Sequence, residues 1–509
     1  MSIHQDSNPT ILLFTNAEYG QANVFFSVAY ELGTTSQSKI HVASFRPFHK
    51  RIEGLQVHIA REGAMTFHTV AGLSYEEALA KRGKGAQELV HPGRWRGAIE
   101  CLGHFGYGLV PWSVEEYYEQ LVSIQSIIEK VNPGLVVIDS LFFGAQDVCR
   151  GMKKKVAILT PNSIKDIIGL RQPWLKGFWK YPCVSTGYPF PIPLHLIPAN
   201  LYVTFRMIYT IATQPHLKAI NHLRKELYGL SNPITHEFTL DTPYILPSTP
   251  ETDFPGLLPT PNLTCCGPIV VPSFKSIDED DELKTWLEES GRQRTVLINL
   301  GSHAVSGVEA VRQIAGGIRI LLADRSLSDS EEGGNTQVQF LWKLLPDEAI
   351  RTALREVIKE EMKEGVVRVV DWLEVEPRVI LEHPNVVCSV HHGGANSFFE
   401  TIDAGVPHIV LPVWHDTYDY ASRVETLGIG VWGSQRSAPF ANDEEFGNAL
   451  KRVLNIGSRE AELFQSNAVA LKAKVNRYGG GRKVAAERIL ELSGVGEATS
   501  CRKKRVSGF

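Results

Sequence analysis

One glycine-rich turn between two apolar runs constrains the fold of this chain more than any other feature does. Residues 385–390 have the composition of a buried strand, Gly393 and Gly394 allow a tight turn, and residues 396–404 then have helical character. A second buried strand is predicted at 408–413. Two such strands joined by a helix form a β-α-β unit, so this segment predicts a parallel sheet with helices packed on it.

The first turn of the predicted helix is suited to hold a phosphate, because helix N-termini carry unpaired N–H groups and a partial positive charge. Each such interaction contributes about 0.3–1 kcal/mol. Asn396 and Ser397 would add side-chain donors. A purely structural alternative is that Ser397 and Glu400 form a capping box. Capping alone does not require His392 just before the glycines or Asp416 after the next strand.

Together these residues form an HxGxNSxxE block, followed by Gly-Val-Pro at 405–407, a proline and the acidic Asp416. The pattern resembles the donor-binding signature of the UDP-glycosyltransferases, and the string HHGGANS is closer to fungal members. By this resemblance His392 contacts the diphosphate and Glu400 accepts the two ribose hydroxyls, while Asp416 holds sugar hydroxyls. The resemblance implies that the diphosphate is also cradled by Gly394, Asn396 and Ser397.

Three other positions bear on the donor. Thr417 departs from the pattern, because many plant members have glutamine there. The side chain at this position helps to distinguish sugar hydroxyls. The identity of the transferred sugar is therefore left open. Gly301 and Ser302 follow a predicted strand and resemble the family's phosphate contacts, with a plain strand-end turn as the alternative. Trp372 resembles the tryptophan that stacks on uracil, although a core tryptophan explains it equally well.

Composition places the chain among ordinary globular proteins. Its 509 residues are 43% hydrophobic, which is enough for two or three domain cores. The net charge of −4 argues against nucleic acid as the main partner. Seven scattered cysteines form no metal-spaced pairs and indicate a reducing compartment. With no signal-like start and no run of about 18 apolar residues, we expect a cytoplasmic protein without a transmembrane segment.

The alternation of short apolar runs with helical stretches predicts the fold class α/β, with two doubly wound Rossmann-like domains. The resemblance implies the GT-B arrangement, in which the two domains face a cleft. We place an acceptor-binding domain at 1–250, a proline-rich linker at 251–272 and a UDP-sugar-binding domain at 273–480. A helix at 481–493 would return to the first domain, before a basic tail at 494–509 that is either solvated or in weak peripheral contact with a membrane.

Strands are predicted at 11–15, 40–45, 134–139, 156–160, 295–300, 338–343 and 366–370, and helices at 22–32, 114–131, 278–289 and 308–322. A flexible insertion is expected at 326–336. The acidic run 278–280 superficially resembles the metal-holding aspartates of another class of glycosyltransferase. Acids in a first helical turn are ordinary complements of the helix dipole, so we predict no metal and no other cofactor.

The acceptor half lacks the family's usual base. In much of this family a histidine after the first strand acts as general base; here Gln21 stands in its place, and an amide cannot accept a proton. Asp139 matches the aspartate that orients this histidine and is our first choice as a replacement. Glu18 is an alternative, and Gln21 would position the acceptor. A third alternative is a histidine from elsewhere, such as His68, His91 or His104.

The character of the acceptor rests on residues 173–209, where aromatic residues are interleaved with prolines. Such a segment suits an apolar acceptor pocket, because pockets are lined mainly by apolar and aromatic side chains. The same residues would also suit a cover over the first sheet. A surface patch that dips into a membrane to collect a lipid acceptor is a third alternative.

We therefore predict an inverting glycosyltransferase that moves a hexose, with UDP-glucose as the expected donor, to a hydrophobic small molecule. The acceptor would be phenolic or polyketide-like, with an O- or C-linkage. A sterol or lipid glucosyltransferase is one alternative, and a non-catalytic UDP-sugar-binding protein is another because Gln21 removes the usual base. A nicotinamide or flavin oxidoreductase would need GxGxxG after the first strand, where residues 16–23 contain only Gly20.

Overall fold

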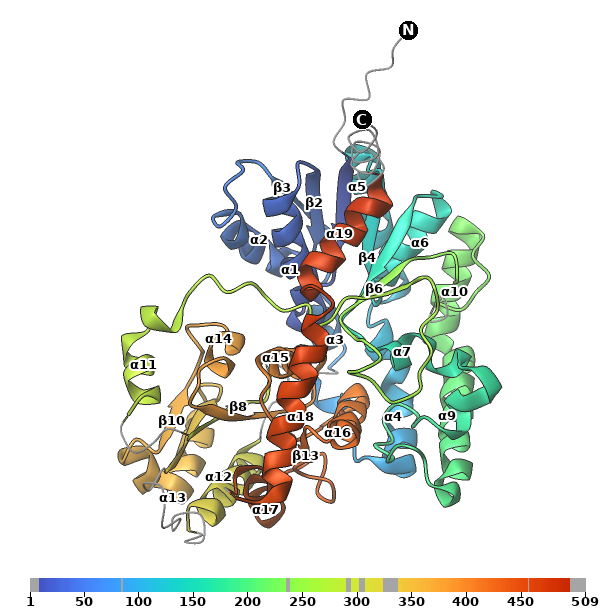
Figure 1. Cartoon of the computed structure of the whole chain (residues 1–509). Coiled ribbons are helices and arrows are strands. Elements are labelled where there is room, and N and C mark those ends of the chain that lie inside the picture. Colours follow the sequence, from blue (N-terminus) through green and yellow to red (C-terminus); the bar gives the residue numbers. More distant parts are fainter. Residues whose placement is uncertain are drawn as a thin grey trace, which may run out of the picture.

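Apolar strands and helices alternate through both halves of the chain and build two parallel sheets, each with helices packed on it (Figure 1). The computed structural model describes residues 9–83, 86–234, 239–289, 294–301, 307–323, 337–455 and 457–494. Both sheets are buried on two faces, which requires near-continuous apolar strands. This requirement is the reason that the strand pattern is visible in the sequence.

Among the described residues the first sheet has the strand order β3-β2-β1-β4-β5-β6-β7, parallel throughout. Leu12 and Phe14 of β1 enter one core, whereas Ile11 and Leu13 enter the core on the opposite face. The order reverses between β1 and β4, so the chain leaves these two neighbouring strands in opposite directions. The strands are β1 Thr10–Phe14, β2 Lys39–Ser44, β3 Met65–Thr69, β4 Leu135–Asp139, β5 Val156–Leu159, β6 Tyr244–Leu246 and β7 Leu263–Cys265.

The helices of the first half are α1 Tyr19–Thr35, α2 His49–Gln56, α3 Tyr75–Lys81, α4 Arg94–Leu109, α5 Val114–Val131, α6 Phe143–Gly151, α7 Ile164–Ile168, α8 Lys176–Trp179, α9 Ile197–Thr213 and α10 Pro215–Tyr228. Several begin at residues that satisfy the free N–H groups of the first turn: Ser113 accepts from Glu116 at the start of α5, and Ser163 from Asp166 at the start of α7. These caps fix where each helix begins.

The second sheet repeats the topology of the first, with the order β10-β9-β8-β11-β12-β13 in the described part of the chain. Its order reverses between β8 and β11. The strands are β8 Arg294–Asn299, β9 Val338–Lys343, β10 Val367–Val370, β11 Val386–His391, β12 His408–Val410 and β13 Gly430–Trp432. The helices are α11 Asp281–Leu287, α12 Val308–Leu322, α13 Glu348–Lys363, α14 Pro377–Leu381, α15 Ala395–Ala404, α16 His415–Leu427, α17 Asp443–Leu454, α18 Arg459–Asn476 and α19 Gly481–Ser493.

The last two helices connect the halves of the molecule. Figure 1 shows α18 beside the second sheet and α19 continuing upward to lie beside α1 of the first. Ala485, Ala486 and Ile489 of α19 enter the same core as Ile11 of β1. Arg482 also pairs with Glu31 of α1 at 2.9 Å. The chain therefore ends its described part packed on the domain in which it began.

Most predicted elements agree with the structure to within a residue or two at their ends, and α5, α12 and β9 agree residue for residue. Strand β3 was not predicted, because it lies at the sheet edge and most of its side chains are not buried. The stretch 251–272, predicted as a linker, contains β7, which pairs with β6 at the edge of the first sheet. The predicted second strand of the β-α-β unit is shorter than expected, ending at Val410.

The acidic run 278–280 has capping roles. Glu279 completes a capping box with Ser276, and Asp280 accepts a hydrogen bond from the Leu283 N–H at the start of α11. Within the described residues, no helix is long and apolar enough to cross a membrane. Three predictions fall outside the described residues: the insertion at 326–336, the phosphate contact Ser302 and, beyond residue 494, the basic tail.

Candidate functional site

The points where the two sheets reverse their strand order bring functional loops together. Asn16 follows β1 and Asp139 ends β4, while Gly301 follows β8 and His392 follows β11. Ligands of open parallel sheets bind at such reversal points, beyond the carboxyl ends of the strands. The Asn396 side-chain amide donates to the carbonyl oxygens of Tyr19 at 3.0 Å and Gly20 at 3.4 Å. The two reversal points therefore meet across one cleft.

His392 lies between two glycines that were predicted to cradle a phosphate. A Cβ on Gly301 would stand 2.7 Å from His392 Cε1, and a Cβ on Gly394 would stand 2.5 Å from His392 Nε2. Gly301 also has φ of 86°, a backbone region that other residues rarely adopt. Both positions thus need glycine because the imidazole occupies the space of a side chain.

The neighbouring His391 has a structural role. Its Nδ1 accepts the Gly393 N–H at 3.1 Å, so its Nε2 carries the proton and donates to His408 Nδ1 at 2.9 Å. Burial lowers the pKa of His391 well below its usual value, and it lowers the pKa of His408 to about 3. Both rings are therefore neutral and hold the end of β11 against β12.

Helix α15 begins without the capping box that was considered as an alternative. Gly394 is its N-cap and offers no side chain, and Glu400 lies in the second turn rather than at the third position of the helix. The N–H groups of the first turn, from Ala395 to Ser397, are thus left for a ligand or water. The Asn396 amide, predicted to donate to the diphosphate, donates instead to the first domain.

On the far side of α15 lie the residues predicted to hold the nucleoside. Burial, followed by the charge of Glu376, raises the pKa of Glu400 to about 8. Trp372 is half exposed, with Lys343 Nζ 3.9 Å from the centre of its ring and Tyr19 against its edge at 6.4 Å. Trp372 is therefore a surface residue in contact with Tyr19 of the first domain and not a core tryptophan.

Asp416 and Thr417 are neighbours in sequence but differ in their access to the cleft. Asp416 lines the cleft, and burial, followed by the charge of Asp166, raises its pKa to about 7. Thr417 is fully buried, and its hydroxyl accepts the N–H groups of Val413 and Trp414 while donating to the Trp414 carbonyl. The hydroxyl of Thr417 thus caps α16 through backbone contacts, whereas its place in the motif predicts a contact with sugar hydroxyls.

Asp139, the first choice as base, lies beneath the cleft surface. It is fully buried, its Oδ2 accepts from the backbone and side-chain amides of Asn16 at 3.3 and 3.4 Å, and its Oδ1 accepts from the Leu141 N–H at 2.9 Å. Burial raises its pKa to about 6. Asn16 and Leu141 line the cleft and Asp139 does not, so its carboxylate acts on the cleft through Asn16.

Glu18 and Gln21 do line the cleft. One carboxylate oxygen of Glu18 accepts the Glu76 N–H at 3.1 Å, while Oε2 is buried without a hydrogen-bond partner among the described residues. The side-chain oxygens of Asn16 and Gln21 share this state. Burial raises the pKa of Glu18 to about 7. The loop after β1 and the first turn of α1 therefore hold three buried acceptor oxygens that have no hydrogen-bond partner among the described residues.

A pocket of about 710 Å³ joins the two walls. The second domain contributes His392, Gly394 and Asp416, and the first contributes Glu18 and Gln21. Apolar side chains make up much of the rest, including Leu79, Leu89, Phe105, Leu109, Leu141 and Met207. None of the three histidines considered as a base, His68, His91 or His104, is among the described residues that line it. The pocket thus combines polar groups at the strand ends with an apolar chamber.

The aromatic segment at 173–209 divides between two environments. Tyr181 is buried and lines the pocket, as do Gly177 and Thr204. Trp174 and Phe205 instead point into solvent, with 84% and 59% of their surfaces exposed. The segment is thus neither purely a pocket wall nor purely a cover over the sheet.

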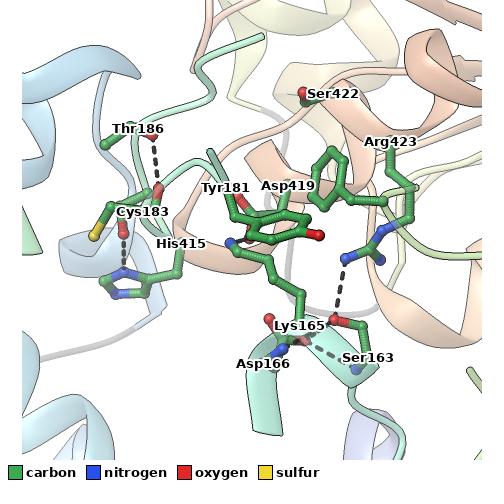
Figure 2. Close-up of polar contacts among 12 residues, drawn as sticks. Ser163, Lys165, Asp166, Tyr181, Cys183, Thr186, His415, Asp419, Ser422 and Arg423 are labelled. Carbon is green, nitrogen blue, oxygen red and sulfur yellow. Dashed lines mark hydrogen bonds and ion pairs between the residues drawn. The ribbon is translucent and has the colours of Figure 1, made fainter. Parts of the chain in front are cut away.

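Buried ion pairs at the side of the pocket hold the domains together, and no motif in the sequence indicated them (Figure 2). Lys165 of α7 contacts Asp419 of α16, and both side chains are buried. Arg423, one turn further along α16, pairs with Asp253 at 3.2 Å and donates to Ser163 at 3.0 Å. Lys165 and Asp166 also line the pocket. These pairs leave no local pattern in the sequence because the partners are far apart along the chain, 254 positions for Lys165 and Asp419.

In the described part of the chain, His91, Cys101 and His415 form a cluster in which a metal could be considered. The chemistry fits poorly. His91 Nε2 accepts the His415 N–H at 3.1 Å, while its Nδ1 faces the Pro92 carbonyl at 2.7 Å. Burial raises the pKa of Cys101 to about 12, so it is a thiol and not the thiolate that binds metals. The cluster is a polar contact between the domains.

Comparison with known proteins identifies relatives over the whole chain. Residues 203–472 match a family model described as "UDP-glucoronosyl and UDP-glucosyl transferase". The glycosyltransferase sdnJ of Sordaria araneosa is 35% identical over 520 residues, covering 95% of this chain and 98% of that protein. UDP-glycosyltransferase 84B2 of Arabidopsis thaliana is 32% identical over 175 residues, which are 32% of this chain and 36% of that protein.

A solved structure has the same fold. It is a complex between 3,4-dichloroaniline and a UDP-glucosyltransferase from Polygonum tinctorium that is described as capable of glucosylating indoxyl. The TM-score is 0.64, with 96% of this chain and 99% of that chain covered at 16% identity. At this identity the likeness concerns the fold alone.

Proposed function

Because the chain belongs to the UDP-glycosyltransferase family, has the two-domain GT-B fold and is therefore an enzyme that transfers sugar from a UDP-sugar, we propose that it moves glucose to a hydrophobic phenolic or polyketide-like acceptor. The observation that carries this proposal is the shared pocket. It sets the first turn of α15 opposite a loop with unpartnered acceptor oxygens, beside an apolar chamber.

On the donor side of the pocket, the wall formed by residues 391–416, the start of α15 and His392 bind the diphosphate of UDP. The N–H groups of Ala395 to Ser397 and the helix dipole stabilise the charge that develops on the leaving group. Glu400 accepts the ribose hydroxyls when it is ionised, Trp372 contacts uracil, and Asp416 binds sugar hydroxyls.

On the acceptor side, the wall formed by residues 15–21 and the apolar chamber, Glu18 is the general base in place of Asp139. Its pKa near 7 matches the requirement that a base accept a proton at neutral pH. Its Oε1 is held by the Glu76 N–H, which leaves Oε2 for the proton. Asp139 positions Asn16, whose Oδ1, together with Gln21 Oε1, orients the acceptor.

The reaction is then a single displacement. Glu18 Oε2 removes the proton from the acceptor hydroxyl as the acceptor oxygen bonds to the anomeric carbon. The bond from that carbon to the β-phosphate oxygen breaks, and its electron pair leaves with UDP. A phenol, with a pKa near ~10, is within reach of a carboxylate base. No step requires a metal, because protein donors neutralise the leaving group.

The test is a mass-spectrometric transfer assay with UDP-glucose, a chelator and a panel of phenols, sterols and lipid alcohols. Wild type should glucosylate a phenol, and Glu18→Gln should lower kcat about 10²–10⁴-fold with UDP binding unchanged. Glu53→Gln is the matched control, because Glu53 is 59% exposed on α2, away from the pocket. Resistance of the product to acid would reveal a carbon linkage.

Three outcomes would contradict the proposal. Wild-type turnover in Glu18→Gln together with loss of turnover in Asp139→Asn would return the base to Asp139. Activity that disappears with the chelator and returns with Mg²⁺ or Mn²⁺ would overturn the metal-free mechanism. No product with any acceptor, alongside UDP binding that Glu400→Ala abolishes, would identify a non-catalytic UDP-sugar-binding protein.

A further inference from the structure

Helix α9 carries apolar side chains on its exposed side as well as on its buried side. Val203, Thr204 and Met207 face inward, toward the pocket or the buried contact with α4, whereas Tyr202 and Phe205 face solvent on the opposite side. Arg206 is the one charged residue of its 17 positions. A helix of this composition is ordinarily buried on all sides or lies at a membrane.

The exposed side of α9 belongs to a larger surface, the apolar face, defined by Trp95, Trp174, Leu175, Tyr202, Phe205 and Tyr209. Contacts make it continuous: Trp95 of α4 meets Tyr202 of α9 with ring centres 6.3 Å apart. Phe178 of α8 stacks on Phe205 at 5.8 Å, and the Trp179 indole donates to the Trp174 carbonyl at 2.9 Å. Figure 1 shows α9 at the outer edge of the first domain, away from α11 and α13.

The tip of this face consists of Trp174 and Leu175. They are 84% and 68% exposed, and both have left-handed backbones, with φ of 60° and 54°. Neither conformation is favourable for a residue with a side chain, so the fold holds two strained residues where they display apolar groups to solvent. Tryptophan and tyrosine, which recur across the face, are the residues enriched where membranes meet water.

The excess of basic residues around the apolar face indicates that its partner carries negative charge. From residue 169 to residue 213 the chain has four basic residues and no aspartate or glutamate, although its total charge is −4. The four are Arg171, Lys176, Lys180 and Arg206. Basic residues beside an apolar face complement the anionic headgroups of a bilayer, into which exposed apolar side chains can insert.

We propose that the apolar face docks the enzyme on the surface of an anionic lipid bilayer. The contact is peripheral: Trp174 and Leu175 enter the region between headgroups and acyl chains, and Arg171 and Lys176, which flank them in sequence, lie at the headgroups. Leu170, half exposed at the edge of this face, also lines the pocket, as do Gly177 and Met207. The pocket therefore opens next to the bilayer, where apolar acceptors concentrate.

The test is flotation of the full chain with vesicles of phosphatidylcholine mixed with phosphatidylserine, and with vesicles of phosphatidylcholine alone. Wild type should float with the mixed vesicles, and less so at high salt. Trp174→Ser/Leu175→Ser should weaken binding about tenfold or more. The matched control is Val57→Ser/Phe440→Ser, because these side chains are 81% and 66% exposed elsewhere on the surface. Arg171→Glu/Lys176→Glu should weaken binding to the mixed vesicles specifically.

Vesicle binding is measured without donor or acceptor, so its outcome is independent of the transfer reaction. Equal Tm values for wild type and variants show that the substitutions did not unfold the chain. The proposal is overturned if wild type floats with neither vesicle, if it floats equally with both, or if the Trp174/Leu175 variant floats as well as wild type. It is also overturned if sedimentation shows a dimer that this variant dissolves while vesicles capture nothing, since a second copy would then cover the face.

Discussion

The donor side of the pocket is built by one continuous stretch of chain, whereas the acceptor side is assembled from segments far apart in sequence. His391 to Asn396 lie within six positions: His391 accepts the Gly393 N–H, and His392 packs against Gly394 and Gly301. The acceptor side draws on residues near 18, 76, 105, 165 and 207. Diphosphate and ribose are common to all UDP-sugars, so the donor side can be a compact local unit. An apolar acceptor of particular shape needs a surface that many segments contribute to.

Breaking the buried ion pair that connects the two domains should have the largest effect on stability. In Lys165→Met the carboxylate of Asp419 would stay buried without its partner, which costs about 3–5 kcal/mol in such pairs. We expect a corresponding loss in the free energy of unfolding, measured by urea denaturation. The double variant Lys165→Met/Asp419→Leu should recover much of it, because no unpaired charge remains. A single variant as stable as wild type would show that the pair does not hold the domains together.

The donor side should be sensitive to a single methyl group where the acceptor side is not. In Gly394→Ala the new Cβ would meet His392 at 2.5 Å, so the ring must move. We expect a loss of about 1–3 kcal/mol in UDP binding, measured by calorimetry. Gly20→Ala, in the first turn of α1, has nothing within 4 Å of its added Cβ and is the matched control. Equal losses in both variants would contradict the steric argument.

The two sides should also differ in their response to pH. Glu18 must be ionised to accept a proton and its pKa is raised to about 7, so kcat should rise about tenfold from about pH 6 to about pH 8. Glu400 has a pKa raised to about 8, so the KM for the UDP-sugar should continue to fall at higher pH. Glu18→Gln should flatten the kcat profile and leave the KM profile in place. A kcat profile unchanged by Glu18→Gln would exclude Glu18 as the titrating base.

The smallest effect should come from Thr417, which lies in the donor motif but faces away from the pocket. Thr417→Val removes the cap of α16 and should lower the free energy of unfolding by about 1 kcal/mol. Discrimination between UDP-glucose and UDP-galactose should not change, because the hydroxyl is bound to the backbone. Competition assays that show an altered sugar preference would return Thr417 to the sugar site.

The difference between the donor and acceptor sides also explains which elements and site residues could be predicted from the sequence. Helices α5 and α12 and strand β9 were predicted to the residue, because their apolar periods are set by burial against one sheet. His392 and Glu400 could be predicted as donor contacts because the residues of their motif are neighbours in sequence. Asp139 was ranked above Glu18 because its position at the end of β4 was visible, whereas the burial that separates it from the pocket was not.

The sequence by itself determined the two doubly wound parallel sheets and the glycine turn, because hydrophobic period, helix caps and the need for glycine act over a few residues. Only the tertiary structure decided which carboxylate reaches the pocket, that Asn396 binds the opposite domain, that Thr417 is a cap, and that the aromatic residues of 173–209 divide between pocket and surface. Burial and long-range contact settle these properties. Both depend on how distant segments pack, and a pattern along the chain does not record that.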